Sequence, residues 1–145
     1  MGAKVSEVLR HKGHNVVTVA PRQTVASVAK VLTENRIGAA PVINEEGHLV
    51  GIISERDIIR GMAKYAEAAP ALAAEELMSR EVKTCSSEDK LVDLMQVMTL
   101  QRIRHLPVVE SGALKGIVSI GDVVKQCLEE VQVEVEQLHT YIRSP

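Results

Sequence analysis

Two short segments decide the fold: GIISERD at residues 51–57 and GIVSIGD at residues 116–122. In each, an apolar stretch that starts with glycine runs into a Ser-x-x-Asp pattern, which is typical of a helix N-terminus. The likeness extends outward: residues 16–62 align with residues 82–127 with one gap near Glu46, and 14 of the 46 paired positions are identical. Chance would supply about three identities in a chain of ordinary composition. The sequence therefore predicts an internal duplication.

Both repeats predict the same order of elements. A short strand (Val16–Ala20; Val82–Cys85) leads into a helix whose apolar residues recur at i, i+3, i+4 and i+7. Two apolar runs joined by a glycine-containing turn then predict a hairpin, from 40–43 and 49–53 in the first repeat and from 106–109 and 114–118 in the second. A second helix starts at Ser54 and at Ser119. The order is β-α-β-β-α twice, an α+β (mixed α/β) fold.

A repeat of about 46 residues is too small to bury an adequate core alone. We therefore expect the two repeats to pack on each other about a pseudo-twofold axis. The expected organisation is a first domain at residues 5–63, an alanine-rich linker at 64–74, a second domain at 75–128 and a helical tail at 129–145.

Composition excludes several classes of protein. The 17 basic and 19 acidic side chains give a net charge of −2, and there is no Phe or Trp, so neither a basic stripe nor stacking platforms for nucleic acid are present. No apolar run reaches the roughly 18 residues of a membrane span. Two cysteines cannot form a disulfide framework. We expect a soluble, cytoplasmic protein without nucleic-acid or membrane partners.

The Ser-x-x-Asp pattern has two interpretations. It can be a capping box, in which both side chains satisfy free N–H groups of the first helical turn. A helix start after a strand is also an anion-binding position, and a carboxylate there can accept both hydroxyls of a vicinal diol such as ribose. The spacing alone leaves both interpretations open.

The doubled motif, preceded in each copy by a strand with Pro-Val at its centre, resembles the cystathionine-β-synthase (CBS) domain, two of which form a Bateman module. The resemblance covers about residues 5–140. It implies two clefts between the repeats that bind AMP, ADP, ATP, S-adenosylmethionine or a dinucleotide such as NAD(H). In that family the motif Asp holds the ribose and the motif Ser lies by the phosphates. Adenine is held by the first strand and the Pro-containing segment, generally of the other repeat.

Carried over to this chain, the resemblance implies one stronger and one weaker cleft. The stronger cleft would use Ser54, Arg56, Asp57, Thr84, Cys85, Ile103, Arg104, His105, Leu106 and Pro107. The weaker cleft would use Thr18, Val19, Ile37, Gly38, Ala39, Ala40, Pro41, Ser119 and Asp122. Arg56, Arg104 and His105 are basic side chains that have no basic counterpart in the other repeat. All three fall in the stronger cleft, so we expect phosphorylated ligands to bind more tightly there.

The implied function is regulatory: the chain would bind an adenosine nucleotide, with AMP favoured and ATP, ADP or NAD(H) as alternatives, and would act on an unidentified protein in trans. The main alternative is a dimerisation scaffold that binds no ligand. We do not expect an enzyme, because the polar motif residues occur as single symmetry-related copies and form no catalytic constellation. We expect no metal site, since His11 and His14 have no third ligand at a suitable spacing.

The C-terminal segment predicts a helix with a heptad repeat. Its apolar positions, spaced 4, 3, 4, 3 and 4 residues apart, are Val124, Leu128, Val131, Val135, Leu138 and Ile142. The first turns can pack on the second repeat, but a compact pair of domains offers no further core beyond about Val131. We therefore expect a homodimer in which this stripe contacts a second chain.

Overall fold

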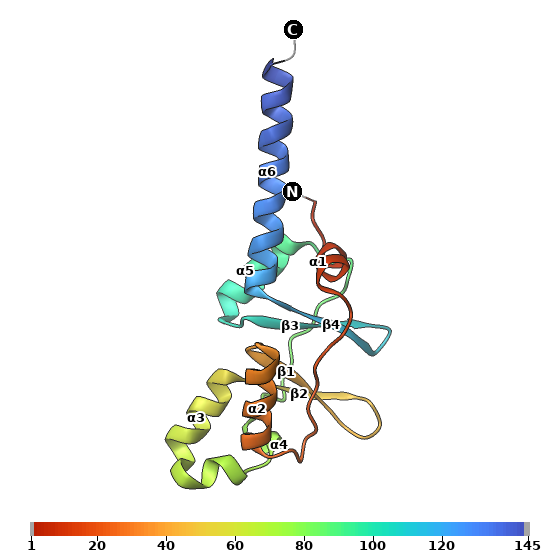
Figure 1. Cartoon of the computed structure of the whole chain (residues 1–145). Helices are drawn as coiled ribbons and strands as arrows, with labels where there is room; N and C mark the ends of the chain where they lie inside the picture. Colours follow the sequence, from red (N-terminus) through yellow and green to blue (C-terminus); the bar gives the residue numbers. More distant parts are fainter. Residues whose placement is uncertain (1, 144–145) are drawn as a thin grey trace. The chain divides into compact units, whose positions relative to one another are not determined.

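The computed structural model describes residues 2–143 and contains both helices and strands (Figure 1). The helices are α1 (Val5–Lys12), α2 (Val25–Asn35), α3 (Glu55–Tyr65), the 3-10 helix η1 (Ala66–Ala71), α4 (Ala74–Leu77), α5 (Leu91–Gln101) and α6 (Ile120–Arg143). The strands form two separate hairpins, β1 (Ala39–Ile43) with β2 (Leu49–Ser54), and β3 (His105–Glu110) with β4 (Ala113–Ser119). The predicted mixed helix-and-strand class is confirmed. Residues 144–145 of the predicted tail lie outside the described residues.

Helices α2 and α5, the first helix of each repeat, end in the same way. Arg36 and Arg102, which are paired in the alignment, both adopt a left-handed conformation with φ of 54°. The next amide then turns back to the helix, with Ile37 N donating to Leu32 O at 3.0 Å in the first repeat. This C-terminal cap satisfies carbonyls of the last turn and directs the chain into the following strand.

The predicted strands at 16–20 and 82–85 are wrong as strands. Only Val19 and Cys85 form bridges, each to the neighbouring strand: Val19 N donates to Pro41 O at 3.1 Å, and Cys85 N donates to Pro107 O at 2.9 Å. Extending either ladder backward would require an N–H on Pro41 or Pro107, and proline has none. In the first repeat Pro21 blocks the forward direction for the same reason.

The chain forms two compact units that cut across the sequence repeats. Unit 1 combines the chain up to His14 with Thr84–Glu110 and the chain from Lys115 onward, and unit 2 combines Asn15–Lys83 with Ser111–Leu114. Helix α1, which precedes the first repeat in sequence, therefore belongs with the second repeat. Helix α4, which precedes the second repeat, belongs with the first.

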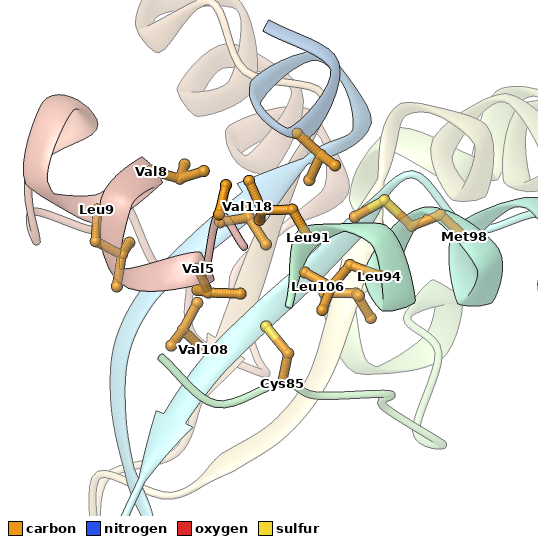
Figure 2. Close-up of a cluster of buried hydrophobic side chains, with 12 residues drawn as sticks. Val5, Val8, Leu9, Cys85, Leu91, Leu94, Met98, Leu106, Val108 and Val118 are labelled. Atoms are coloured by element: carbon orange, nitrogen blue, oxygen red, sulfur yellow. The ribbon is translucent and has the colours of Figure 1, made fainter. Parts of the chain in front are cut away.

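Matching backbone bonds hold these two helices in place. In unit 1, Leu91 N donates to Ala3 O at 3.0 Å. In unit 2, Val25 N donates to Leu72 O at 2.8 Å. Apolar side chains follow: Val5, Val8 and Leu9 of α1 join the core formed with α5, β3 and β4 (Figure 2). Ala74 and Met78 join the corresponding core of unit 2.

The motif glycines make room for these helices. A Cβ atom on Gly51 would meet the Met78 side chain and, at 2.9 Å, the carbonyl oxygen of Ser79. A Cβ atom on Gly116 would meet Leu9 of α1 at 2.6 Å. The glycine that opens each motif is thus a position of close approach between a strand and the segment packed across it.

The alanine-rich segment 64–74 has regular structure. Lys64 and Tyr65 complete α3, η1 follows, and Ala74 begins α4. Ala69 and Ala74 are fully buried. Small side chains at these positions allow the backbone of this segment to approach the core of unit 2.

We predict that Gly51→Ala destabilises the protein by about 1–3 kcal/mol, because the added methyl group meets backbone that cannot move as freely as a side chain. Urea unfolding measures the change. Gly121→Ala is the matched control: its added Cβ meets only Ser119 Oγ, at an ordinary contact distance of 3.6 Å. Alanine also favours the helix by up to about 1 kcal/mol there. A Gly51→Ala protein as stable as the control would contradict this role for the glycine.

Candidate nucleotide-binding site

Both Ser-x-x-Asp motifs form capping boxes. In the first, Asp57 Oδ2 accepts from Ser54 N at 2.8 Å and Asp57 N donates to Ser54 Oγ at 3.3 Å. In the second, Asp122 Oδ2 accepts from Ser119 N at 2.9 Å and Asp122 N donates to Ser119 Oγ at 3.1 Å. The capping interpretation is therefore correct for both copies. It fixes each carboxylate at the N-terminal end of α3 or α6, where the helix dipole favours negative charge.

Each helix start is bonded to the Pro-containing segment of its own repeat. Glu55 N donates to Gly38 O at 2.9 Å, and Ile120 N donates to Arg104 O at 2.8 Å. Unit 2 thereby gathers the first-repeat candidates Thr18, Val19, Ile37, Gly38, Ala39, Ala40, Pro41, Ser54, Arg56 and Asp57. Unit 1 gathers the second-repeat candidates Thr84, Cys85, Ile103, Arg104, His105, Leu106, Pro107, Ser119 and Asp122.

The two predicted clefts combine these groups differently. Each takes its helix motif from one unit and its strand segments from the other. The combination of Asp57 with Arg104 and His105 therefore stays a prediction, as does that of Asp122 with the segment 37–41. Within their own units, Arg56 and Arg104 have exposed side chains.

The Asp122 motif has a basic partner that the comparison of the two repeats did not reveal. Lys12, the last residue of α1, places its Nζ 2.7 Å from Asp122 Oδ2 and donates a second bond to Ile117 O at 3.0 Å. The pair is only partly exposed, with 36% of the Lys12 and 27% of the Asp122 side chain accessible. By contrast, Asp57 pairs with Arg60 at the longer distance of 4.0 Å, and the Arg60 side chain is 76% exposed.

The environment of Asp122 lowers its pKa below the ordinary value. Partial burial raises the pKa, but the hydrogen bond from Lys12, the bonds from Ser119 and the charge of Lys12 together outweigh that effect. Because Lys12 and the Ser119 amide both donate to Oδ2, this oxygen has little capacity left for a further donor. A ligand hydroxyl at Asp122 would have to bind the other oxygen or displace Lys12.

Cys85, a candidate for contact with adenine, is part of the unit 1 core. Burial, with smaller contributions from Asp89 and Glu110, raises the pKa of its thiol to about 12. The thiol therefore stays protonated and acts as a small apolar side chain. Glu110 in turn accepts from Ser87 N at 2.7 Å and holds the loop that follows Cys85.

Residues 2–143 offer neither a metal site nor a membrane span. This part of the chain contains no group of three or more His, Cys, Asp or Glu side chains placed to hold a metal ion. None of its helices is both long and apolar enough to cross a membrane.

The CBS domain family model matches residues 5–64 and 74–129, so the chain belongs to the CBS-domain family and carries two copies of the domain. It is 33% identical to the mitochondrial CBS domain-containing protein CBSX3 of Arabidopsis thaliana, over 96% of this chain and 71% of that protein. The crystal structure of the CBS-domain protein ATU1752 from Agrobacterium tumefaciens is 38% identical, covers 86% of this chain and 93% of its own, and superposes with a TM-score of 0.84. The CBS domain pair of protein MJ0100, solved with 5′-methylthioadenosine and S-adenosylmethionine, is 23% identical, with a TM-score of 0.76 over 90% of this chain and 99% of its own.

We predict that Lys12→Met lowers the free energy of unfolding at pH 7 by up to about 1 kcal/mol, since the pair is partly exposed. Because the folded-state pKa of Asp122 is lowered, its contribution is complete above the unfolded pKa of about 3.9 and is lost as the pH falls through the folded value. The difference between Lys12→Met and the unchanged protein should therefore shrink as the pH falls below about 3.9. Urea unfolding between pH 7 and pH 3 measures it.

Lys4→Met is the control, because Lys4 pairs with Glu88 at 3.0 Å where the two side chains are 44% and 74% exposed. This variant should change stability by less than about 0.5 kcal/mol. A loss for Lys12→Met that is the same at pH 7 and pH 3 would attribute the effect to packing of the Lys12 stem instead of its charge.

Proposed function

We propose that the chain is a regulatory protein of the cytoplasm that binds an adenosine nucleotide, holds its ribose at Asp57 and acts on another protein in trans. AMP is the favoured ligand, with ADP, ATP, NAD(H) and S-adenosylmethionine as alternatives. No catalytic step is part of the proposal. The two cysteines are free thiols, which suits a reducing compartment.

The difference between the two motif carboxylates carries the proposal. Asp57 Oδ2 accepts from the amide and the hydroxyl of Ser54, at 2.8 and 3.0 Å, so this oxygen is committed to the cap. Its Oδ1 lies 4.0 Å from Nη1 of Arg60, a side chain that is 76% exposed. One carboxylate can therefore cap α3 and still offer an oxygen with two lone pairs to a ligand hydroxyl. At Asp122 the Lys12 ammonium already pairs with the carboxylate, so a ligand must bind the other oxygen beside this cation or displace it.

Charge near Asp57 supports a phosphorylated ligand. Arg56 lies beside it in the first turn of α3, where free N–H groups and the helix dipole also favour an anion. Arg104 and His105 are the further cations expected at this ligand from the sequence. The complex of MJ0100 with two adenosyl compounds supports the ligand class, because that protein has the same fold.

Homodimerisation is the second part of the proposed function. Large apolar side chains are exposed along α6, and exposed apolar surface of this extent marks an interaction site. A second copy of the chain would cover it, and the regulated protein would bind the assembled dimer.

We predict that Asp57→Ala weakens binding of AMP or ATP about 10- to 100-fold, because removing an acceptor that is charged costs about 1.5–3 kcal/mol. Asp122→Ala is the matched control: it removes the same capping carboxylate from the motif that already holds Lys12, and affinity should change much less. Calorimetric titration measures both variants. Equal losses in the two would contradict the assigned asymmetry.

The cap must be separated from the ligand contact. Asp57→Asn keeps a side-chain oxygen that can accept from Ser54 N and so preserves most of the cap. It should still lose affinity, because the charge and one acceptor are removed. Unchanged affinity in Asp57→Asn and Asp57→Ala would assign Asp57 to helix capping alone.

A ligand screen distinguishes the sensor from the scaffold. A ligand that binds only the folded protein raises its unfolding midpoint. We expect AMP to do so, and ADP, ATP, NADH and S-adenosylmethionine serve as the comparison set. A dimer whose midpoint responds to none of the five compounds would be a ligand-free scaffold.

A further inference from the structure

Helix α6 exposes a heptad stripe that the chain itself leaves uncovered. The stripe consists of Val124, Leu128, Val131, Val135, Leu138 and Ile142, whose exposed fractions range from 39% to 71%. Only the start of α6 is held by its unit: Val123 is fully buried, and Cys127 packs against the same core. Residues 131–143 are all exposed, and this part of α6 extends beyond α1 and α5 of its unit (Figure 1).

The last heptad layers favour two parallel strands, whereas Leu128 at position a and the valines at position d of the earlier layers do not select this number. Numbering the stripe places Leu128, Val135 and Ile142 at position a, with Val124, Val131 and Leu138 at position d. β-Branched residues at a, together with leucine at d, favour a parallel two-stranded coiled coil. Both features occur in the last two heptad layers of α6.

The flanking charges select the same arrangement. In a parallel in-register pair, position g of one chain lies beside the next position e of the other, which places Glu134 beside the partner subunit's His139. No like charges meet in this register. An antiparallel pair centred on the stripe would instead bring Glu134 against its own counterpart. Like charges so placed destabilise an interface.

The acidic residues of α6 limit the number of strands. Glu129 and Glu136 fall at position b and Glu130 at position c, on the outer side of a two-stranded coil. A trimer or tetramer would cover more of each helix and bring these carboxylates closer to their neighbours. Two strands cover the apolar stripe and leave the acidic side chains in water.

We propose that α6 pairs with α6 of a second copy as a parallel, in-register coiled coil over residues 124–142, with Glu134 of each chain beside His139 of the partner subunit. The proposal rests on the homodimer of the proposed function and assigns its surface, its register and its direction. It is independent of which ligand the chain binds.

Sedimentation velocity on the full chain tests the surface. Leu138→Asp places a charge in the stripe, and Val133→Asp places the same charge on the opposite face of α6, at a valine of similar exposure (58% and 52%). We expect Leu138→Asp to weaken dimerisation at least about tenfold and Val133→Asp to dimerise like the unchanged chain. Both positions are exposed, and thermal unfolding verifies that the two variants are folded.

The outcomes are separable. Equal dimerisation of the two variants would overturn the coiled coil and leave the homodimer to another surface. A monomeric unchanged chain at micromolar concentration would overturn both the homodimer and the coiled coil. Calorimetric titration with AMP on the same samples reports ligand binding independently of either result.

Disulfide trapping tests the direction, in a Cys127→Ala background that leaves only the buried Cys85. In the parallel pair, Ile142→Cys places two thiols opposite each other, so mild oxidation should cross-link the dimer. In an antiparallel pair the two positions would be about 27 Å apart, 18 residues at about 1.5 Å each. Val133→Cys is the control and should remain uncross-linked. A cross-link only in the control, or in neither variant of a dimeric protein, would overturn the parallel register.

Charge reversal tests the Glu134–His139 pair. Glu134→Lys should weaken the dimer a few-fold, and His139→Glu added to it should restore affinity by creating an opposite pair in the same place. If the second change weakens the dimer further, the two side chains do not meet across the interface.

Discussion

A two-stranded hairpin cannot bury enough apolar surface to be stable by itself, and every feature of this chain depends on how that deficit is met. Each hairpin packs with the helix that precedes it and the helix that follows it in its own repeat. It also packs with one segment from outside the repeat. The outside segment crosses a strand where Gly51 or Gly116 leaves space. The duplication in sequence is thus completed by an exchange of helices: α1 closes the core of the second repeat, and α4 closes that of the first.

Local patterns predicted most of the elements because their causes are local. Apolar spacing located α2 and α5, glycine turns located both hairpins, and Ser-x-x-Asp located the starts of α3 and α6. The strands at 16–20 and 82–85 were over-predicted because β-propensity ignores the partner strand, whose Pro41 or Pro107 ends the ladder after one residue. The assignment of α1 to unit 1 was not predictable from periodicity, since it depends on packing between segments about 80 residues apart.

In the candidate site, too, contacts within one motif could be predicted and contacts between distant segments could not. Serine and aspartate within one motif could be paired from their spacing, and their reciprocal bonds confirm it. Lys12 could not be paired with Asp122, because 110 residues separate them and the contact exists only after α1 has docked. This lysine makes two nearly identical motifs electrostatically different. We expected the surroundings of the two motifs to differ in charge because of Arg104 and His105. Lys12 is a second, independent cause of such a difference, and it lies in the same unit as Asp122.

The placement of α1 also sets an order for folding during synthesis. Residues 15–83 supply nearly all of unit 2, so this unit can assemble once that stretch has left the ribosome. Helix α1 emerges before unit 2, yet its partners in α5, β3 and β4 are made after that unit. Its apolar face, with Val5, Val8 and Leu9, therefore waits through most of translation for the core that covers it. While unit 2 folds, the nascent chain thus carries an uncovered hydrophobic helix ahead of it, which is the kind of surface that chaperones bind.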